Sequence, residues 1–309
     1  TDLPTVGVLV GQFGIGKIGW AGRVTHDNEA TSGIASSTYN DYGYYREACG
    51  FKGVMNCILL PEANVVHETA QINTLLQVRH VTQILDAKVG ESLKIGQIGG
   101  QLGTAIIESI TQDCIQLRDV QLTIAPPPKL DLTVILALPR PKVLRRLIMD
   151  MTALGVRHII LINSYRTQKS YWQSPMLERL DEFVLEGLQQ SVDTIAPSID
   201  LKKRFKPFVE DELANLVTNG AIVAHPYSTQ SFAQYIKKQP LDKPYLDHPD
   251  LKKPPVSGLP SLVCIGAEGG WIDYEIALLV TQGCEPVHIG PRILRTEAAV
   301  NALLGQWLL

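Results

Sequence analysis

The chain has 309 residues, of which 45% are hydrophobic and 19% are charged, and its formal net charge is −3. This length allows two domains with cores of their own, and this composition excludes a disordered protein. No apolar run approaches the ~20 residues that a membrane helix needs. The negative net charge gives no general attraction to nucleic acid, so RNA binding would need a local basic patch.

The cysteines are few and scattered. The chain has five cysteines, and none of them belongs to a CxxC or CxxH spacing. They are Cys49, Cys57, Cys114, Cys264 and Cys284. An odd, scattered set indicates reduced thiols rather than a disulfide framework or a zinc site. We therefore expect a cytoplasmic protein without a metal centre.

Residues 1–54 carry two glycine-rich patterns typical of nucleotide-binding motifs. Residues 14–19 match GxGxxG, and residues 11–17 nearly match a phosphate-binding P-loop. The P-loop lacks its Ser or Thr for magnesium, because Ile18 follows the lysine, and no helical apolar period follows the glycines. We interpret both patterns as chance matches and expect only a strand over residues 5–10.

Residues 55–125 are punctuated in the way that short strands are. Strands are predicted over residues 92–95, 104–110 and 114–122, with glycines between them, after a helix over residues 74–85. Several short strands in so short a stretch indicate a small barrel. The three prolines at 126–128 prevent helix and ladder bonding, so we place a domain boundary there.

From Asp131 onward strands and helices alternate. The apolar pattern predicts strands over residues 132–138, 157–162 and 221–224, and it predicts helices over residues 142–154, 176–191 and 207–218. Such alternation implies a parallel sheet with helices on both faces. A surface loop without a core pattern is expected over residues 237–260.

Two apolar runs near the C-terminus each lead into a glycine-bearing loop and then a helix. Residues 262–265 and 286–289 are the predicted strands, and helices are expected over residues 272–281 and after Arg295. Thr296 would cap the last helix, with Glu297 in its first turn. Loops at the carboxyl ends of parallel strands are where an α/β sheet binds a small molecule.

These two loops resemble the signature loops of a known family. Ile265-Gly-Ala-Glu-Gly-Gly270 and Ile289-Gly-Pro-Arg-Ile-Leu-Arg-Thr-Glu297 are similar to those of the RsmE-type methyltransferases of the SPOUT superfamily. Those enzymes methylate N3 of a uridine in 16S ribosomal RNA with S-adenosylmethionine (SAM). The second loop is long and specific, and a weaker resemblance runs from about Met55 to the C-terminus.

The resemblance implies a domain plan. Residues 55–125 would form a PUA-like β-barrel that docks RNA, and residues 126–309 a SPOUT methyltransferase domain with a parallel sheet and a C-terminal trefoil knot. The family also implies a homodimer. Residues 1–54 lie outside the match, as an N-terminal extension or as the product of a start called upstream of Met55.

The resemblance also implies a SAM site without a metal. Its candidate cofactor-binding residues are Cys264, Ile265, Gly266, Glu268, Gly269, Gly270, Ile289, Gly290, Ile293, Leu294, Arg295 and Thr296. Arg295 and Glu268 are the candidate catalytic residues, because a guanidinium suits a uracil oxyanion or a phosphate. Arg292 is a second candidate for that role. The alternatives are an ion pair of Arg295 with Glu297, and a Glu268 that only serves the dipole of the next helix.

Several departures from the family pattern fall outside the two loops. Ala267 replaces a proline, and Asp86, Asp150 and Asp193 stand where positive charge is usual. We interpret these acidic positions as lying on the substrate side. The prediction is therefore a SAM-dependent methyltransferase acting on N3 of a uridine in small-subunit ribosomal RNA. A paralogue with another RNA target, or a SAM- or RNA-binding protein without catalysis, remains open.

Overall fold

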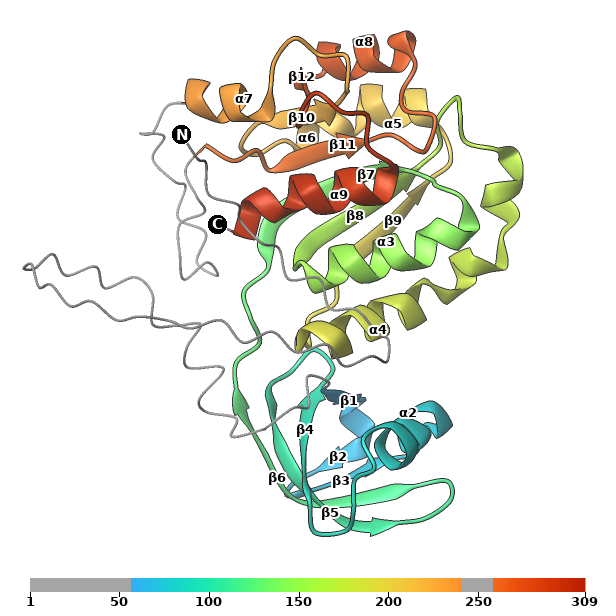
Figure 1. The fold of residues 1–309 in the computed structure, drawn as a ribbon, viewed down its shortest axis with the longest axis vertical. Coiled ribbons are helices and arrows are strands. Elements are labelled where there is room, and N and C mark those ends of the chain that lie inside the picture. Colours follow the sequence, from blue (N-terminus) through green and yellow to red (C-terminus); the bar gives the residue numbers. More distant parts are fainter. Residues whose placement is uncertain (1–56, 240–257, 309) are drawn as a thin grey trace, which may run out of the picture. The chain divides into compact units, whose positions relative to one another are not determined.

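The computed structural model describes residues 57–239 and 258–308. These residues build two six-stranded sheets and the helices that cover them (Figure 1). No helix among them is long and apolar enough to cross a membrane. The strand expected over residues 5–10, the glycine patterns beside it and most of the loop expected over residues 237–260 lie outside the described residues.

The first sheet is mixed. Its strands are β1 (Ile58–Leu60), β2 (Val65–Val66), β3 (Thr69–Ile72), β4 (Ser92–Gln97), β5 (Leu102–Ile110) and β6 (Ile115–Ile124), in the order β1-β4-β5-β6-β3-β2. Strand β1 runs parallel to β4, and the other pairs are antiparallel. The sheet curls without closing, since β1 and β2 stand at opposite ends of this order (Figure 1). The small barrel predicted for this part is therefore confirmed only in part, as a curled half-barrel.

The helix expected over residues 74–85 is confirmed as two consecutive pieces, α2 (Leu75–Arg79) and the wider-turned η2 (His80–Ile84). A short 3-10 turn, η1 (Glu62–Asn64), follows β1. The buried side of the sheet and the helix share one apolar cluster that includes Ile72, Val78 and Ile107. This cluster is the core of the first sheet.

The second sheet is entirely parallel, as predicted. Its strands are β7 (Leu130–Ala137), β8 (Val156–Ile162), β9 (Ser198–Lys202), β10 (Ala221–Ala224), β11 (Leu262–Ile265) and β12 (Cys284–Val287), in the order β12-β10-β11-β7-β8-β9. Strand β12 ends two residues earlier than predicted, because its pairing with β10 stops at Val287. Strand β9 was missed: it is a sheet edge, and its largely exposed residues give no continuous apolar run.

Helices cover both faces of this sheet (Figure 1). One face packs against α3 (Pro141–Ala153), α4 (Leu180–Ser191), α7 (Phe232–Lys238) and α9 (Thr296–Leu304). The other face packs against α5 (Phe205–Asp211), α6 (Leu213–Leu216) and α8 (Asp273–Thr281). Successive side chains of a strand point to opposite faces, so Val134 of β7 joins the first group and Ile135 the second.

Two helical segments differ from the sequence prediction. The single helix expected over residues 207–218 is divided into α5 and α6, because Glu212 between them departs from helical geometry. Helix α7 was not predicted, although Ser231 and Gln234 form a capping box at its start. The described residues also contain three further 3-10 turns: η3 (Lys169–Gln173), η4 (Pro175–Arg179) and η5 (Gly305–Leu308).

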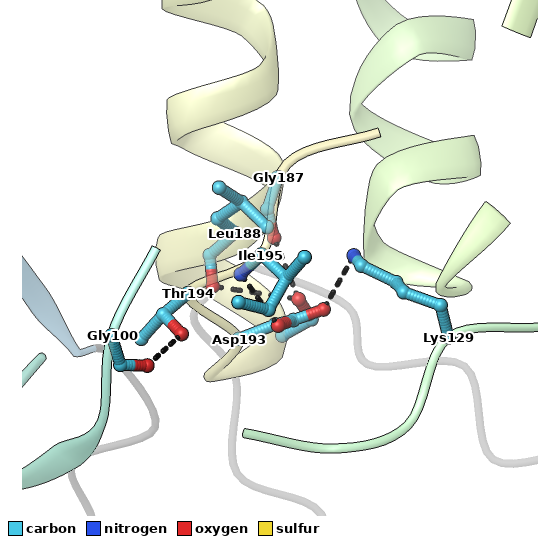
Figure 2. Close-up of polar contacts among 8 residues, drawn as sticks. Gly100, Lys129, Gly187, Leu188, Asp193, Thr194 and Ile195 are labelled. Atoms are coloured by element: carbon cyan, nitrogen blue, oxygen red, sulfur yellow. Dashed lines mark hydrogen bonds and ion pairs between the residues drawn. The ribbon is translucent and has the colours of Figure 1, made fainter. Parts of the chain in front are cut away.

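The segment after α4 contacts the loop between β4 and β5 of the first sheet (Figure 2). The N–H of Gly99 donates to the carbonyl oxygen of Thr194 (2.8 Å), and the Thr194 hydroxyl donates to the carbonyl of Gly100. The side chain of Gln77 donates to Gln189 of α4 (3.0 Å). These bonds join the two sheets at the carboxyl end of α4.

Candidate functional site

A cavity of about 260 Å³ opens where β10, β11 and β12 end. The carboxyl ends of parallel strands meet at one edge of the sheet, so the loops that follow them converge there. Ten of the twelve predicted cofactor-binding residues line this cavity: Ile265, Gly266, Glu268, Gly269, Gly270, Ile289, Gly290, Ile293, Leu294 and Thr296. The other two, Cys264 and Arg295, do not.

The first glycine loop folds tightly back on itself. The N–H of Gly270 donates to the carbonyl oxygen of Ala267 (2.8 Å). A Cβ at Gly266 would lie 2.9 Å from Cα of Gly270 and 3.1 Å from the backbone nitrogen of Trp271. Real Cβ atoms do not approach backbone so closely, so this turn requires glycine at position 266.

Glu268 joins this loop to the start of α3. Its Oε1 accepts a hydrogen bond from the backbone N–H of Arg140 (3.0 Å) and another from Nε of Arg140 (3.1 Å). Arg140 is the residue that precedes the first turn of α3. The carboxylate therefore lies at a helix N-terminus, where negative charge is favoured, but the helix is α3 and not the following α8.

A carboxylate that was not predicted from the sequence holds the loop after β8 against the start of α8. Glu275 of α8 is only 3% exposed. Its Oε1 accepts from the backbone N–H of Tyr165 (2.7 Å), and its Oε2 accepts from that of Ile272 (3.0 Å). Arg166, beside Tyr165, donates to the carbonyl oxygen of Gly269 and lines the cavity. A glutamate three residues into a helix indicates the Ile272 bond, but nothing local indicates the Tyr165 bond.

The second glycine loop presents bare backbone to the cavity. Gly290 has a φ of 151°, and a Cβ placed on it would meet no atom within 4 Å. Its N–H donates to Nδ1 of His288 (3.2 Å). Arg295 is the N-cap residue of α9 and Thr296 the first helical residue, and no side chain caps this helix. The prediction that Thr296 caps the last helix was therefore wrong, whereas Glu297 does lie in the first turn.

Two arginines beside the cavity carry uncompensated charge. Arg292 lines the cavity and is exposed, and Arg295, three residues further along the chain, is also exposed. Neither forms an ion pair within residues 57–239 and 258–308. Glu297, the alternative partner considered for Arg295, instead lies 3.5 Å from a guanidinium nitrogen of Arg146 on α3.

Cys264 belongs to the core and not to the cavity wall. It is fully buried on β11, where its neighbours include the thiol of Cys284 on β12. Burial, followed by the hydrogen bond and the charge of the Cys284 thiol, raises the pKa of Cys264 well above its usual range. A thiol in this state is inert near neutral pH.

The acidic positions noted in the sequence do not share one surface. Asp193 is buried against Lys129 (2.6 Å between Oδ2 and Nζ), so placing it on a substrate-facing surface was wrong. Asp150 accepts a hydrogen bond from the amide of Asn301 on α9 (3.0 Å). Asp86 alone is exposed, paired with Lys88. In the described part of the chain, no group of three or more His, Cys, Asp or Glu residues could hold a metal ion.

Known proteins resemble this chain in both sequence and fold. A family model described as an RNA methyltransferase domain matches residues 126–308. A ribosomal RNA small subunit methyltransferase E from Treponema pallidum is 26% identical over 253 residues, which are 80% of this chain and 88% of that protein. Its counterpart from Synechocystis is 25% identical over 265 residues, 84% of this chain and 79% of that protein.

Solved structures share the fold at lower identity. The structure of a ribosomal RNA small subunit methyltransferase E from Neisseria gonorrhoeae, bound to S-adenosyl methionine, has a TM-score of 0.60 and 20% identity. The match covers 82% of this chain and 96% of that one. The family model spans more than half of the chain, including β7 to β12 and both glycine loops. This chain therefore belongs to the family of proteins with an RNA methyltransferase domain.

Proposed function

We propose that this protein transfers a methyl group from SAM to N3 of a uridine in the ribosomal RNA of the small subunit. The observation that carries the proposal is the cavity between the two glycine loops, in a chain of the RNA methyltransferase family. The names of its relatives support small-subunit ribosomal RNA as the substrate. The SAM bound to the similar Neisseria protein supports the cofactor.

The residues of the cavity fit a sulfonium nucleoside. Ile265, Ile289, Ile293 and Leu294 offer apolar walls to an adenine ring, and all four line the cavity. At Gly290 the space that a Cβ would fill is open, so a ligand can approach the backbone closely. A small-molecule site of this kind combines apolar walls with a few polar groups.

SAM, when bound, supplies an electrophilic methyl group on a positively charged sulfur. In the transfer, the bond from N3 to the methyl carbon would form as the bond from that carbon to sulfur breaks. S-adenosylhomocysteine would leave with the electron pair of that bond, and the N3 proton would pass to solvent water. Negative charge develops on the uracil during this step, and the unpaired guanidinium of Arg295 is our candidate to stabilise it, with Arg292 beside it. Alignment of the two reactants in the cavity is the larger contribution.

Glu268 has a more limited role in this proposal. Its Oε1 is occupied by Arg140, so it holds the first glycine loop against α3. Its Oε2 has no partner in the described part of the chain and could accept a hydrogen bond from a ligand hydroxyl. Glu268 would thus position the cofactor or the substrate and keep the cavity in shape.

The larger architecture is also part of the proposal. Residues 55–125 would form a PUA-like domain and residues 126–309 a SPOUT domain with a trefoil knot, and residues 1–54 an extension. The start of β7 at Leu130, soon after the three prolines, and the match over residues 126–308 support this division. The protein would act as a homodimer in the cytoplasm, where small ribosomal subunits are available.

The test is incubation with small ribosomal subunits from cells that lack this protein, using SAM with a labelled methyl group. We expect label in the ribosomal RNA, and mapping of the labelled base should find N3 of one uridine. Label at another base or in another RNA would indicate a paralogue with a different target. Absence of transfer, with SAM binding retained in calorimetry, would indicate a binding protein without catalysis.

A further inference from the structure

Tyr227 is a large aromatic side chain left in solvent at the edge of the cofactor cavity. It follows β10, lines the cavity and is 75% exposed. Other exposed tyrosines exist, but Tyr274 on α8, which is 53% exposed, is not part of the cavity. The position of Tyr227 thus combines exposure with closeness to the reaction site.

The backbone that carries Tyr227 is firmly held. Residues 225–228 form a turn in which the N–H of Ser228 donates to the carbonyl oxygen of His225 (3.1 Å), with Pro226 fixing φ at the second position. The Ser228 hydroxyl donates to the carbonyl oxygen of Pro286 (2.7 Å). The N–H of His225 donates to the carbonyl oxygen of Val287 (2.9 Å). Both ends of the turn are therefore bonded to β12.

The ring of Tyr227 also has support from within the turn. The rings of His225 and Tyr227 meet edge to face, with centroids 5.6 Å apart and an interplanar angle of 72°. Such a contact restrains the side chain, while most of the ring surface remains open to solvent. A ring that is fixed in advance loses little conformational entropy when a flat ligand stacks on it.

The charges around the cavity favour RNA at this place. Residues 57–125 contain four Lys or Arg and seven Asp or Glu residues, so the first sheet has no general attraction for phosphates. Exposed arginines are found instead at the cavity: Arg166 and Arg292 line it, and Arg140 is paired with Glu268 of its lining. A nucleotide entering the cavity would meet these charges together with the ring of Tyr227.

We propose that the ring of Tyr227 stacks on the nucleobase of the RNA that enters the cavity, so that it determines RNA affinity and not cofactor affinity. The proposal rests on the function proposed above. An enzyme that modifies a base must take it out of its stack, and an aromatic side chain replaces part of the lost stacking. Any base can stack on a tyrosine ring, so Tyr227 contributes to binding while other groups identify uracil.

The test compares three purified full-length variants with the wild type: Tyr227→Ala, Tyr227→Phe and Tyr274→Ala. Calorimetry gives the Kd for SAM, transfer to small ribosomal subunits gives KM and kcat, and fluorescence anisotropy gives the Kd for labelled oligouridylate. Loss of a stacked ring weakens binding about 5- to 150-fold, so Tyr227→Ala should raise both the KM for subunits and the oligouridylate Kd by that factor. The Kd for SAM should remain within about twofold of wild type, since the proposal gives Tyr227 no contact with the cofactor.

Tyr227→Phe separates the ring from its hydroxyl. We expect it to bind RNA like the wild type, and Tyr274→Ala to do the same as the matched control for loss of an exposed tyrosine. The proposal is overturned if Tyr227→Phe weakens RNA binding as much as Tyr227→Ala does. It is also overturned if Tyr227→Ala leaves the RNA affinity unchanged, or if that variant mainly weakens SAM binding. If the wild type transfers no methyl group, the proposed function fails, while the oligouridylate measurement still decides the role of Tyr227.

Discussion

Lys129 and Asp193 form an ion pair in the interior of the protein. Nζ of Lys129 lies 2.6 Å from Oδ2 of Asp193, and the two side chains are only 9% and 3% exposed (Figure 2). The other carboxylate oxygen accepts a hydrogen bond from the N–H of Ile195 (2.9 Å). Lys129 directly precedes β7, and Asp193 follows α4, so the pair holds these two segments together. The next residue, Thr194, forms the hydrogen bonds with Gly99 and Gly100 of the first sheet.

The first prediction concerns the stability that depends on this pair. Lys129→Met should lower the free energy of unfolding by about 3–5 kcal/mol, because it leaves a buried carboxylate without its counter-ion. Asp193→Asn keeps an oxygen for the Ile195 bond and removes the charge. The double variant should therefore recover most of the loss, as measured by urea denaturation of all four proteins. Additive losses in the double variant would show that the two charges do not interact.

The second prediction concerns the first glycine loop. Gly266→Ala should weaken SAM binding about 5- to 150-fold in calorimetry. The added methyl group would displace the loop that lines the cavity, and such overpacking costs about 1–3 kcal/mol. Gly305→Ala is the matched control, because a Cβ there meets nothing within 4 Å. Equal SAM affinity in the two variants would mean that the turn at Gly266 does not shape the site.

The third prediction concerns Arg295. Arg295→Ala should lower kcat for methyl transfer about 100- to 1,000-fold, the usual effect of removing one group that stabilises a developing oxyanion. Its SAM affinity and melting temperature should not change, because the side chain is exposed and has no ionic partner in the described residues. Arg179→Ala removes an exposed guanidinium outside the cavity and is the control. Full activity of Arg295→Ala would remove Arg295 from the mechanism.

The fourth prediction concerns alkaline pH. Burial, with smaller contributions from Glu285 and Cys284, raises the pKa of Tyr235 to about 12. In the unfolded chain this phenol loses its proton near pH ~10, whereas in the folded protein it keeps the proton until about pH 12. The free energy of unfolding should therefore fall as the pH rises between these values.

Comparison with Tyr235→Phe isolates this contribution, since the remaining tyrosines and the cysteines also titrate at high pH. The variant should lose less stability than the wild type between pH ~10 and ~12 in urea denaturation. Parallel curves for the two proteins would contradict the raised pKa of Tyr235.

The sequence was a good guide to the elements near the C-terminus. The strand over residues 262–265 and the helix that follows it were predicted closely, since a buried parallel strand is a short apolar run and glycines end it. The edge strand β9 was missed, because strand signals of this kind depend on burial on both faces. The cap of α9 was wrong by one residue, since the path of the entering loop decides where helical geometry begins.

The contacts between distant segments could not be predicted. Glu275 binds the backbone of a residue 110 positions away, and Glu268 binds Arg140 at a separation of 128. Both contacts exist because loops from non-adjacent stretches of the chain meet at one edge of the sheet. Asp193 was misplaced for a related reason: a charged residue is normally exposed, and only its partner Lys129 accounts for its burial.

By itself, the sequence determined the class of the second sheet, the two glycine loops and the family resemblance. These depend on apolar periodicity and on glycine geometry, which are properties of short stretches. Only the tertiary structure decided which side chains surround the cavity, and hence the positions of Arg140, Arg166 and Tyr227 beside it. The order of parallel strands brings these residues together, and strand order is a property of the whole chain.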